Sequence, residues 1–326
     1  MKKKVAVVMG GYSSEYGISI KSGKVVCEHL NKTLYEVFPI HILADKWIYI
    51  ADNKVEYAID KSDFSVNINK KKIIFDVVFN AIHGHPGEDG VLIAYFELLG
   101  MAHTSDTSYK MGLTFNKRDC LSVLDAYGIA HAKSYYLNKG VVIDTKEIVK
   151  KVGLPCFVKA NRGGSSYGIS KVYKENGLKV AIEHSYKEDD EVLIEEFLDG
   201  VELSVGVITY KDKVKVLPIT EIVSENDYFD FEAKYLGKSQ EVTPARITRK
   251  QEKQVVAIAE KVYKILRLKG ISRAEYIFKN GIPHFVEINT VPGLTEESIL
   301  PQQAKKANIS LENLFGSMVE NALLNV

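Results

Sequence analysis

Four polar residues on one predicted β-hairpin have the types and spacing of a metal or phosphate site. Two runs of alternating apolar residues flank Asn280-Gly281, a dipeptide typical of a hairpin turn. Strand side chains alternate between the two faces of a sheet, so Arg273 and Glu275 share one face of the first strand. Glu287 and Asn289 share one face of the second strand for the same reason.

The register of this hairpin decides whether the two pairs face each other. A two-residue turn places Glu275 opposite Val286, with the acids on opposite faces. A three-residue loop with a left-handed Gly281 places Glu275 opposite Glu287 instead. Facing carboxylates repel unless a cation neutralises them, and carboxylate and amide oxygens suit Mg²⁺. An exposed hairpin with solvated acids is an equally good interpretation of these residues alone.

A loop rich in glycine and serine between two other predicted strands could bind phosphate. It follows Lys159 in the segment FVKANRGGSSYGISKVY, and the unhindered backbone amides of such a loop can approach phosphate oxygens. The segment lacks the GxxxxGK[ST] pattern, which excludes a P-loop ATPase. A mobile surface loop is the alternative interpretation.

Two loops near the N-terminus could face a common crevice. Gly10-Gly11 follows an apolar strand, and His83–Gly90 follows the apolar run Ile73–Ile82. Ligands of open α/β sheets lie beyond the carboxyl ends of the strands. Complementing the dipole of the next helix is the simpler role for Glu88 and Asp89. The GxGxxG pattern is absent, so a nicotinamide site is not predicted.

Composition indicates a soluble protein of two or three domains, because 326 residues exceed one typical core. The 43 basic and 42 acidic residues nearly cancel, which gives no electrostatic case for nucleic acid or an anionic membrane. No apolar run is long enough to span a bilayer, and the N-terminal one is too short for a signal peptide. Cys27, Cys120 and Cys156 show no CxxC spacing, so we expect buried thiols in a reducing, cytoplasmic compartment.

The order of the predicted elements divides the chain into three units, at residues 1–115, 116–196 and 197–326. The first alternates strands and helices, which favours an α/β unit with a central parallel strand pair. A polar, aromatic-rich stretch from residue 224 to 243 is longer than most loops of compact domains, so we expect it to be functional.

Taken together, these segments resemble the ATP-grasp superfamily and, within it, the D-alanine–D-alanine ligase family. The resemblance covers nearly the whole chain and rests on the number, order and spacing of its motifs: GGYSSE, HGHPGEDG, FNKRD, FVKANRGGSSYG, VLIEEFLDGVE, FDFEAKYL, SRAEY and VEINTVPGLTEESILP. It implies an N-terminal α/β domain with a parallel, Rossmann-like sheet, followed by a two-lobed ATP-grasp fold that holds ATP between two small antiparallel sheets. It also implies the hairpin register in which Glu275 faces Glu287.

The resemblance implies a metal and nucleotide site. Glu275, Glu287 and Asn289 would hold two Mg²⁺ or Mn²⁺ ions against the ATP phosphates, although relatives more often carry Asp at the first position. Glu196 stands where some relatives carry a lysine. The residues that would contact ATP are Lys117, Lys159, Ser166, Glu195, Phe197, Leu198, Glu202 and Lys234.

The resemblance also assigns residues to the substrates. Arg273 and backbone amides near Gly293 would stabilise an oxyanion, and Ser298 would bind the carboxylate of the second D-alanine. His83 would help neutralise the first substrate's carboxylate. The ammonium of the first D-alanine would lie at Glu15, which forms a hydrogen-bonded trio with Ser165 and Tyr235.

The implied activity is ATP-dependent ligation of two D-alanines through D-alanyl phosphate, with release of ADP and phosphate, for peptidoglycan precursors. A homodimer is expected from the same resemblance. Two alternatives are another ATP-grasp carboxylate–amine ligase, with a different amino acid in one subsite, and a nucleotide-binding protein without catalysis. Tyr235 favours an amine nucleophile, because relatives that form the ester with D-lactate lack this tyrosine.

Overall fold

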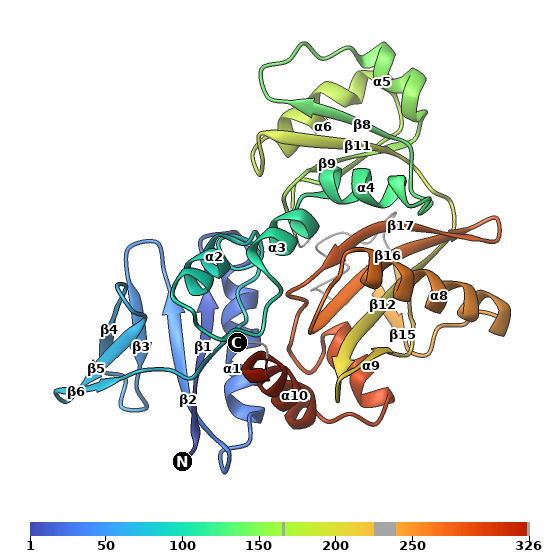
Figure 1. Ribbon diagram of the computed structural model, residues 1–326. Coiled ribbons are helices and arrows are strands. Elements are labelled where there is room, and N and C mark those ends of the chain that lie inside the picture. Colours follow the sequence, from blue (N-terminus) through green and yellow to red (C-terminus); the bar gives the residue numbers. More distant parts are fainter. Residues whose placement is uncertain (165–166, 225–238, 325–326) are drawn as a thin grey trace.

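The N-terminal lobe is built on a seven-stranded sheet with the order β6-β5-β4-β3-β2-β1-β7. The computed structural model describes residues 1–164, 167–224 and 239–324 (Figure 1). In the first sheet β1 is parallel to β2 and β7, whereas β3, β4, β5 and β6 each pair antiparallel with their neighbours. The expected parallel sheet is therefore a mixed sheet. Its strands are β1 (Lys3–Gly10), β2 (Tyr35–Ile42), β3 (Trp47–Ile50), β4 (Glu56–Asp60), β5 (Ser65–Ile68), β6 (Lys71–Ile73) and β7 (Val77–Asn80).

Helices from both ends of the chain pack on this sheet. The lobe's own helices are α1 (Tyr16–His29), α2 (Val91–Leu98) and α3 (Ser108–Phe115). The C-terminal helix α10 (Leu311–Leu324) returns to the N-terminal lobe, as Figure 1 shows, and its Phe315 lies in one core with Val7 and Phe79. Among the described helices, none combines the length and apolar character needed to cross a bilayer.

The central lobe holds a four-stranded antiparallel sheet with the order β10-β9-β11-β8. Apolar side chains of α5 and α6, such as Ile148 and Ile182, form a core with Val158 and Ile194 of the sheet. The elements are α4 (Lys117–Ala126), β8 (Ser134–Asn138), α5 (Thr145–Val152), β9 (Cys156–Ala160), β10 (Ser170–Val172), the short helix η1 (Glu175–Gly177), α6 (Leu178–Ser185) and β11 (Glu191–Glu196).

The C-terminal lobe holds a six-stranded sheet in which β12 is the central strand. Leu124 of α4 and Val262 of α8 are buried against this sheet, so α4 packs on the C-terminal lobe. The elements are β12 (Val201–Tyr210), β13 (Lys213–Val216), β14 (Thr220–Ser224), β15 (Ser239–Val242), α8 (Arg249–Ile265), β16 (Ile271–Lys279), β17 (Ile282–Asn289) and α9 (Ile299–Lys306).

The turn of the β16–β17 hairpin is the tighter of the two expected alternatives. Lys279 pairs with Ile282, so the loop contains only Asn280 and Gly281. Both have positive φ angles, 52° and 82°, as a type I′ turn requires. The three-residue loop that would have put the acids face to face is therefore absent from this hairpin.

A β-bulge nevertheless brings the two acids together. The register shifts after Tyr276–Phe285, so that Glu275 pairs with Glu287 and Val286 is the extra residue on β17. The implied facing register is confirmed, but it arises from the bulge and not from the loop length.

Candidate functional site

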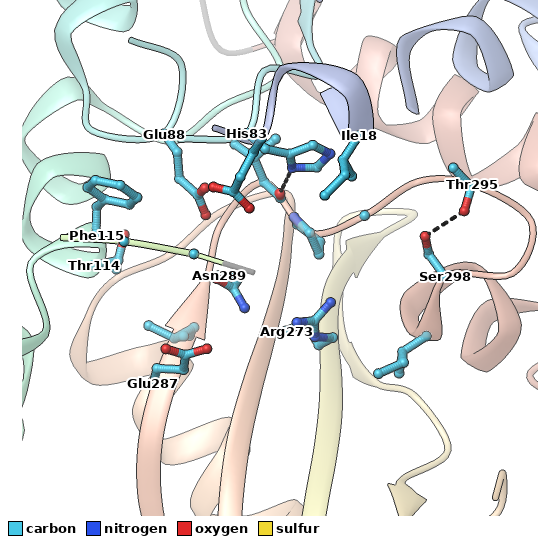
Figure 2. Close-up of a pocket in the computed structure, with 18 of the residues that line it drawn as sticks. Ile18, His83, Glu88, Thr114, Phe115, Arg273, Glu287, Asn289, Thr295 and Ser298 are labelled. Atoms are coloured by element: carbon cyan, nitrogen blue, oxygen red, sulfur yellow. Dashed lines mark hydrogen bonds between the residues drawn. The ribbon is translucent and has the colours of Figure 1, made fainter. Parts of the chain in front are cut away.

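A cavity of about 320 Å³ lies where the three lobes meet, and we call it the junction cavity. Figure 2 shows side chains of the N-terminal lobe on one side and those of the β16–β17 hairpin on the other. It brings together predicted residues that are far apart in the sequence: Glu15, His83, Lys117, Arg273, Glu287, Asn289, Gly293 and Ser298.

The paired faces of β16 and β17 form one wall of this cavity. Arg273 lies opposite Asn289 and Glu275 opposite Glu287. The Nε of Arg273 donates to Oε1 of Glu275 at 2.8 Å, and the Ser204 hydroxyl donates to the same oxygen at 3.3 Å. These contacts fix the position of the Glu275 carboxylate.

The other oxygen of Glu275 indicates a cation site. Among the residues that the structure describes, Oε2 of Glu275 is buried without a hydrogen-bond partner. A buried carboxylate oxygen is costly unless it is paired or coordinates a metal. Together with the carboxylate of Glu287 and the amide of Asn289, it gives the oxygen donors that Mg²⁺ or Mn²⁺ prefers. The residues present therefore fit the implied metal.

A second cavity of about 490 Å³, the sheet cavity, lies between the central and C-terminal sheets. Glu287 lines both cavities and therefore joins them. Phe157 and Ile222 add apolar walls from the two opposing sheets. The predicted nucleotide residues that line the sheet cavity are Lys159, Glu195, Phe197, Leu198 and Glu202.

Two buried lysines supply positive charge beside Glu287. Lys117 lies 3.3 Å from Oε2 of Glu287 and donates to the Gly163 carbonyl at 2.7 Å. Lys159 forms an ion pair with Glu195. Burial works against the charged form of Lys159, but the carboxylates of Glu195 and Glu287 outweigh it and raise the pKa of this lysine. Lys159 therefore stays cationic, as phosphate binding requires.

Glu196, the position at which some relatives carry a lysine, has a charged neighbour of opposite sign. Glu196 lines the sheet cavity, and Lys279 of β16 lies 3.8 Å from its carboxylate. An ammonium group is thus present close to the place where those relatives carry a lysine, but it is supplied by another strand.

Glu15 lies at the N-terminus of α1, where the helix dipole favours a negative charge. Its carboxylate is buried against Gly164 of the central lobe. A Cβ atom at residue 164 would lie 2.6 Å from Oε2 of Glu15, so only glycine allows this approach. The glycine-rich loop therefore closes directly over Glu15.

His83 uses both ring nitrogens within the protein. Nδ1 donates to the Val291 carbonyl at 2.7 Å, and Nε2 lies 2.9 Å from the Ser22 hydroxyl. Because that hydroxyl accepts from the Leu294 amide, its own proton is available to Nε2, which makes the imidazole neutral. Burial lowers the pKa of His83 in agreement. A substrate carboxylate would have to displace one of these partners.

Glu88 belongs to the cavity and not to a helix terminus. Its side chain is buried, and Oε2 accepts from the Gly84 amide at 3.1 Å. Asp89 is the residue that complements the next helix, because Oδ1 accepts from the Val91 amide. Burial, and after it the charge of Glu15, raises the pKa of Glu88 to about 8.

Replacing Glu88 with glutamine should remove part of the pH dependence of stability. The folded state holds the Glu88 proton up to pH 8, whereas the ordinary pKa of 4.5 applies to the unfolded chain. This group therefore weakens the fold as pH rises from 4.5 to 8. We expect the melting temperature of Glu88→Gln, relative to wild type, to increase between pH 5 and pH 8.5, measured by circular dichroism. A difference that does not vary with pH would contradict the buried carboxyl.

The loop that connects β17 to α9 forms the remaining wall. Ser298 is the N-cap residue of α9, and its hydroxyl lies 2.8 Å from that of Thr295 (Figure 2). Gly293 lies next to Ser298 in the same cavity. Thr295, Ser298 and Arg273 line the same cavity (Figure 2).

Four predicted residues, Ser165, Ser166, Lys234 and Tyr235, lie outside the described part of the chain. The lining residues that were not predicted as site residues include Glu241 and Thr295 in the junction cavity and Phe157 in the sheet cavity. The position of Thr295 within the LTEESILP segment could have indicated it. Glu241 carries no comparable sequence signal.

Two family models match most of the chain. The model described as D-ala D-ala ligase N-terminus matches residues 4–105, and that described as D-ala D-ala ligase C-terminus matches residues 123–320.

Individual relatives agree with these matches. A D-alanine–D-alanine ligase of Flavobacterium johnsoniae is 60% identical over 98% of this chain and 99% of its own length. Among solved structures, the VanG D-Ala:D-Ser ligase from Enterococcus faecalis has a TM-score of 0.86 at 29% identity, covering 99% of this chain and 100% of that chain. The D-alanine–D-alanine ligase from Bacillus anthracis complexed with ATP has a TM-score of 0.79 at 27% identity, and the match covers 99% of this chain and 98% of that chain.

Proposed function

The chain belongs to the D-alanine–D-alanine ligase family, and from this premise we propose how its residues carry out the reaction. The enzyme joins two D-alanines into D-alanyl-D-alanine at the expense of ATP, for cell-wall peptidoglycan. The assignment of residues rests on one observation, the shared face of the paired strands β16 and β17. It places Arg273, Glu275, Glu287 and Asn289 together where the junction and sheet cavities meet.

ATP occupies the sheet cavity. Its apolar walls, Phe157, Phe197 and Ile222, suit the adenine ring, and Glu202 on β12 accepts hydrogen bonds from the ribose hydroxyls. The phosphates point toward Lys159 and Lys117, because both buried ammonium groups interact with Glu287. Ser166 and Lys234 complete the phosphate contacts as proposed from the resemblance.

In this proposal two Mg²⁺ or Mn²⁺ ions would be held by Glu275, Glu287 and Asn289. The assignment is supported by Oε2 of Glu275, which is buried and has no hydrogen-bond partner among the described residues. When bound, such ions neutralise charge on the ATP phosphates. In the protein itself, Arg273 contacts Glu275, and Lys117 and Lys159 interact with Glu287. Removing divalent cations with a chelator should therefore abolish turnover.

The first D-alanine binds with its ammonium near Glu15. Its carboxylate oxygen attacks the γ-phosphorus, the bond to the bridging oxygen breaks, and ADP leaves with the electron pair. Phosphoryl transfer needs positioning and charge neutralisation more than covalent help, and the two lysines supply both. Closure of the glycine-rich loop over Glu15 excludes the water that would hydrolyse D-alanyl phosphate.

The second D-alanine binds with its carboxylate at Ser298. Its amine, after losing a proton, attacks the acyl carbon and forms the C–N bond, and the C–O bond to phosphate then breaks. Negative charge develops on the carbonyl oxygen in this step. Arg273 and the amide near Gly293 stabilise it, because both residues line the junction cavity. The resemblance implies a trio of Glu15, Ser165 and Tyr235, of which only Glu15 lies in the described part of the chain.

We also propose that the enzyme works in the cytoplasm, where ATP is available, as a homodimer formed through the N-terminal lobe. Val91 and Leu98 of α2 and Tyr109 of α3 are exposed apolar side chains that a second copy would cover. Light scattering of the purified protein should give twice the mass of 36.5 kDa. A mass equal to the single chain would overturn the dimer.

ADP release with different amino acids tests the function directly. We expect steady release with ATP and D-alanine, a product with the mass of the dipeptide, and no turnover with L-alanine. D-Serine and D-lactate, each supplied with D-alanine, test the second subsite, and we expect D-alanyl-D-alanine to remain the main product. A product containing another amino acid would favour the alternative carboxylate–amine ligase, and ATP binding without any turnover would favour a regulatory protein.

A further inference from the structure

A buried glutamine bridges a gap in the pairing of the C-terminal sheet. β12 pairs with β14 up to Ser204 and with β13 from Val207 onward, so its backbone between these residues lacks a continuous neighbour on that side. Gln303 of α9, which is 0% exposed, fills the gap. Its Oε1 accepts from the Gly206 amide at 3.0 Å, and its Nε2 donates to the Ser204 carbonyl at 2.9 Å.

The same side chain contacts β14 and is linked, through Thr220, to the residue that follows β15. Nε2 of Gln303 also donates to the Thr220 hydroxyl at 3.0 Å. The Thr220 and Thr243 hydroxyls lie 2.6 Å apart, and Thr243 directly follows β15. β15 in turn carries Glu241, which lines the junction cavity. Gln303 therefore connects α9 directly with β12 and β14, and through Thr220 with the residue that follows β15.

Each connected segment carries a residue of the site. Ser298 is the N-cap of α9, and Ser204 of β12 donates its hydroxyl to Glu275. Apolar contacts of Leu300 and Ala304 also bury α9, but such contacts are non-directional and allow a helix to shift. A buried side-chain amide whose hydrogen bonds are all made instead fixes the helix in one position relative to the sheet.

We propose that Gln303 is a positioning residue for the second amino acid. By fixing α9 against β12 and β14, it sets the distance between Ser298 and Arg273 across the junction cavity. This inference rests on the proposed function, in which Ser298 binds the carboxylate of the second D-alanine. Gln303 itself does not line the cavity.

Replacing Gln303 with methionine tests the proposal, because methionine has similar length and no amide. We expect the KM of the second D-alanine to rise about tenfold or more, since small displacements of a binding group are costly. The KM values of ATP and of the first D-alanine should change less than about twofold, because β12 and β14 remain hydrogen-bonded to each other and β12 to β16, whereas α9, which carries Ser298, loses its polar contacts with the sheet. Initial rates over a wide range of D-alanine concentrations separate the two amino-acid constants.

Asn321→Leu is the matched control. Asn321 also connects a C-terminal helix to β12, by donating to the Thr209 carbonyl at 3.0 Å, but it lies away from both cavities. Both variants should lower the melting temperature, whereas only Gln303→Met should change the KM of the second D-alanine. If the two variants have the same kinetics, Gln303 is merely structural and the proposal is overturned. If wild type forms no dipeptide, the proposed function fails and the positioning role fails with it.

Gly206 gives an independent test of the same contact. A Cβ atom at residue 206 would lie 2.5 Å from Oε1 of Gln303, so Gly206→Ala must displace the amide without deleting it. We expect Gly206→Ala to reproduce the kinetics of Gln303→Met. In a Gln303→Ala background the glycine replacement should add little further change in the KM of the second D-alanine. Additive effects of the two substitutions would overturn the proposal.

Discussion

Replacing Arg273 with methionine should lower kcat about 100- to 1,000-fold, the loss typical of removing one donor to a developing oxyanion. The guanidinium is held at the cavity wall by its hydrogen bond to Glu275 and is only 16% exposed, so water cannot substitute for it effectively. In our proposal Arg273 acts on the reacting atoms only in the acyl-transfer step, and the Ser204 hydroxyl still contacts Glu275 in the variant, so the KM for ATP should change much less than kcat.

The measurement is the steady-state rate of dipeptide formation at saturating ATP and D-alanine. Arg249→Met, at the exposed start of α8, is the control for loss of a positive charge and should keep wild-type kinetics. Arg273→Lys retains the charge without the planar fork and should fall between wild type and Arg273→Met. A kcat within threefold of wild type in Arg273→Met would show that the oxyanion is stabilised elsewhere.

Replacing Glu287 with glutamine should lower kcat/KM for ATP about 100-fold or more, because a cation site loses one of its two carboxylates. The change keeps the shape of the side chain, so the effect reports charge. Glu287 is the acid that lines both cavities, and it lies 3.3 Å from Lys117. We therefore expect the Mg²⁺ concentration for half-maximal activity to rise as well.

Titrating activity with Mg²⁺ and with Mn²⁺ separates metal binding from folding. Glu260→Gln, which breaks an exposed ion pair with Lys264 on α8, is the matched control and should leave the titration unchanged. Circular dichroism should show that Glu287→Gln remains folded. An unchanged metal titration, together with an unchanged kcat/KM, would refute the assignment of Glu287.

Much of the site followed from local patterns that physical chemistry restricts strongly. Strand alternation alone placed Arg273 with Glu275 and Glu287 with Asn289. Apolar residues recur at helical spacing between residues 248 and 267, and α8 occupies Arg249–Ile265 with Thr248 as its N-cap. The apolar run Ile73–Ile82 was less well predicted, because burial alone does not show where a strand ends. It contains the end of β6, a break, and β7.

Resemblance supplied the roles of residues that the pattern could not connect. From composition and spacing alone, the hairpin could equally be an exposed one with solvated acids, and the glycine-rich loop could be a mobile surface loop. The order of the motifs favoured one family, to which the chain belongs. Several of those roles depend on contacts between lobes, which no local pattern contains.

The sequence by itself determined the elements, the face that each polar residue shares with its neighbour, and the family. Only the tertiary structure decided how these faces meet, because long-range contacts fix the register and the burial. The bulge at Val286 brings Glu275 opposite Glu287 despite a two-residue turn. Packing between lobes buries Glu88 and makes His83 neutral. The gap between β13 and β14 gives Gln303 three polar partners from segments far apart in the chain.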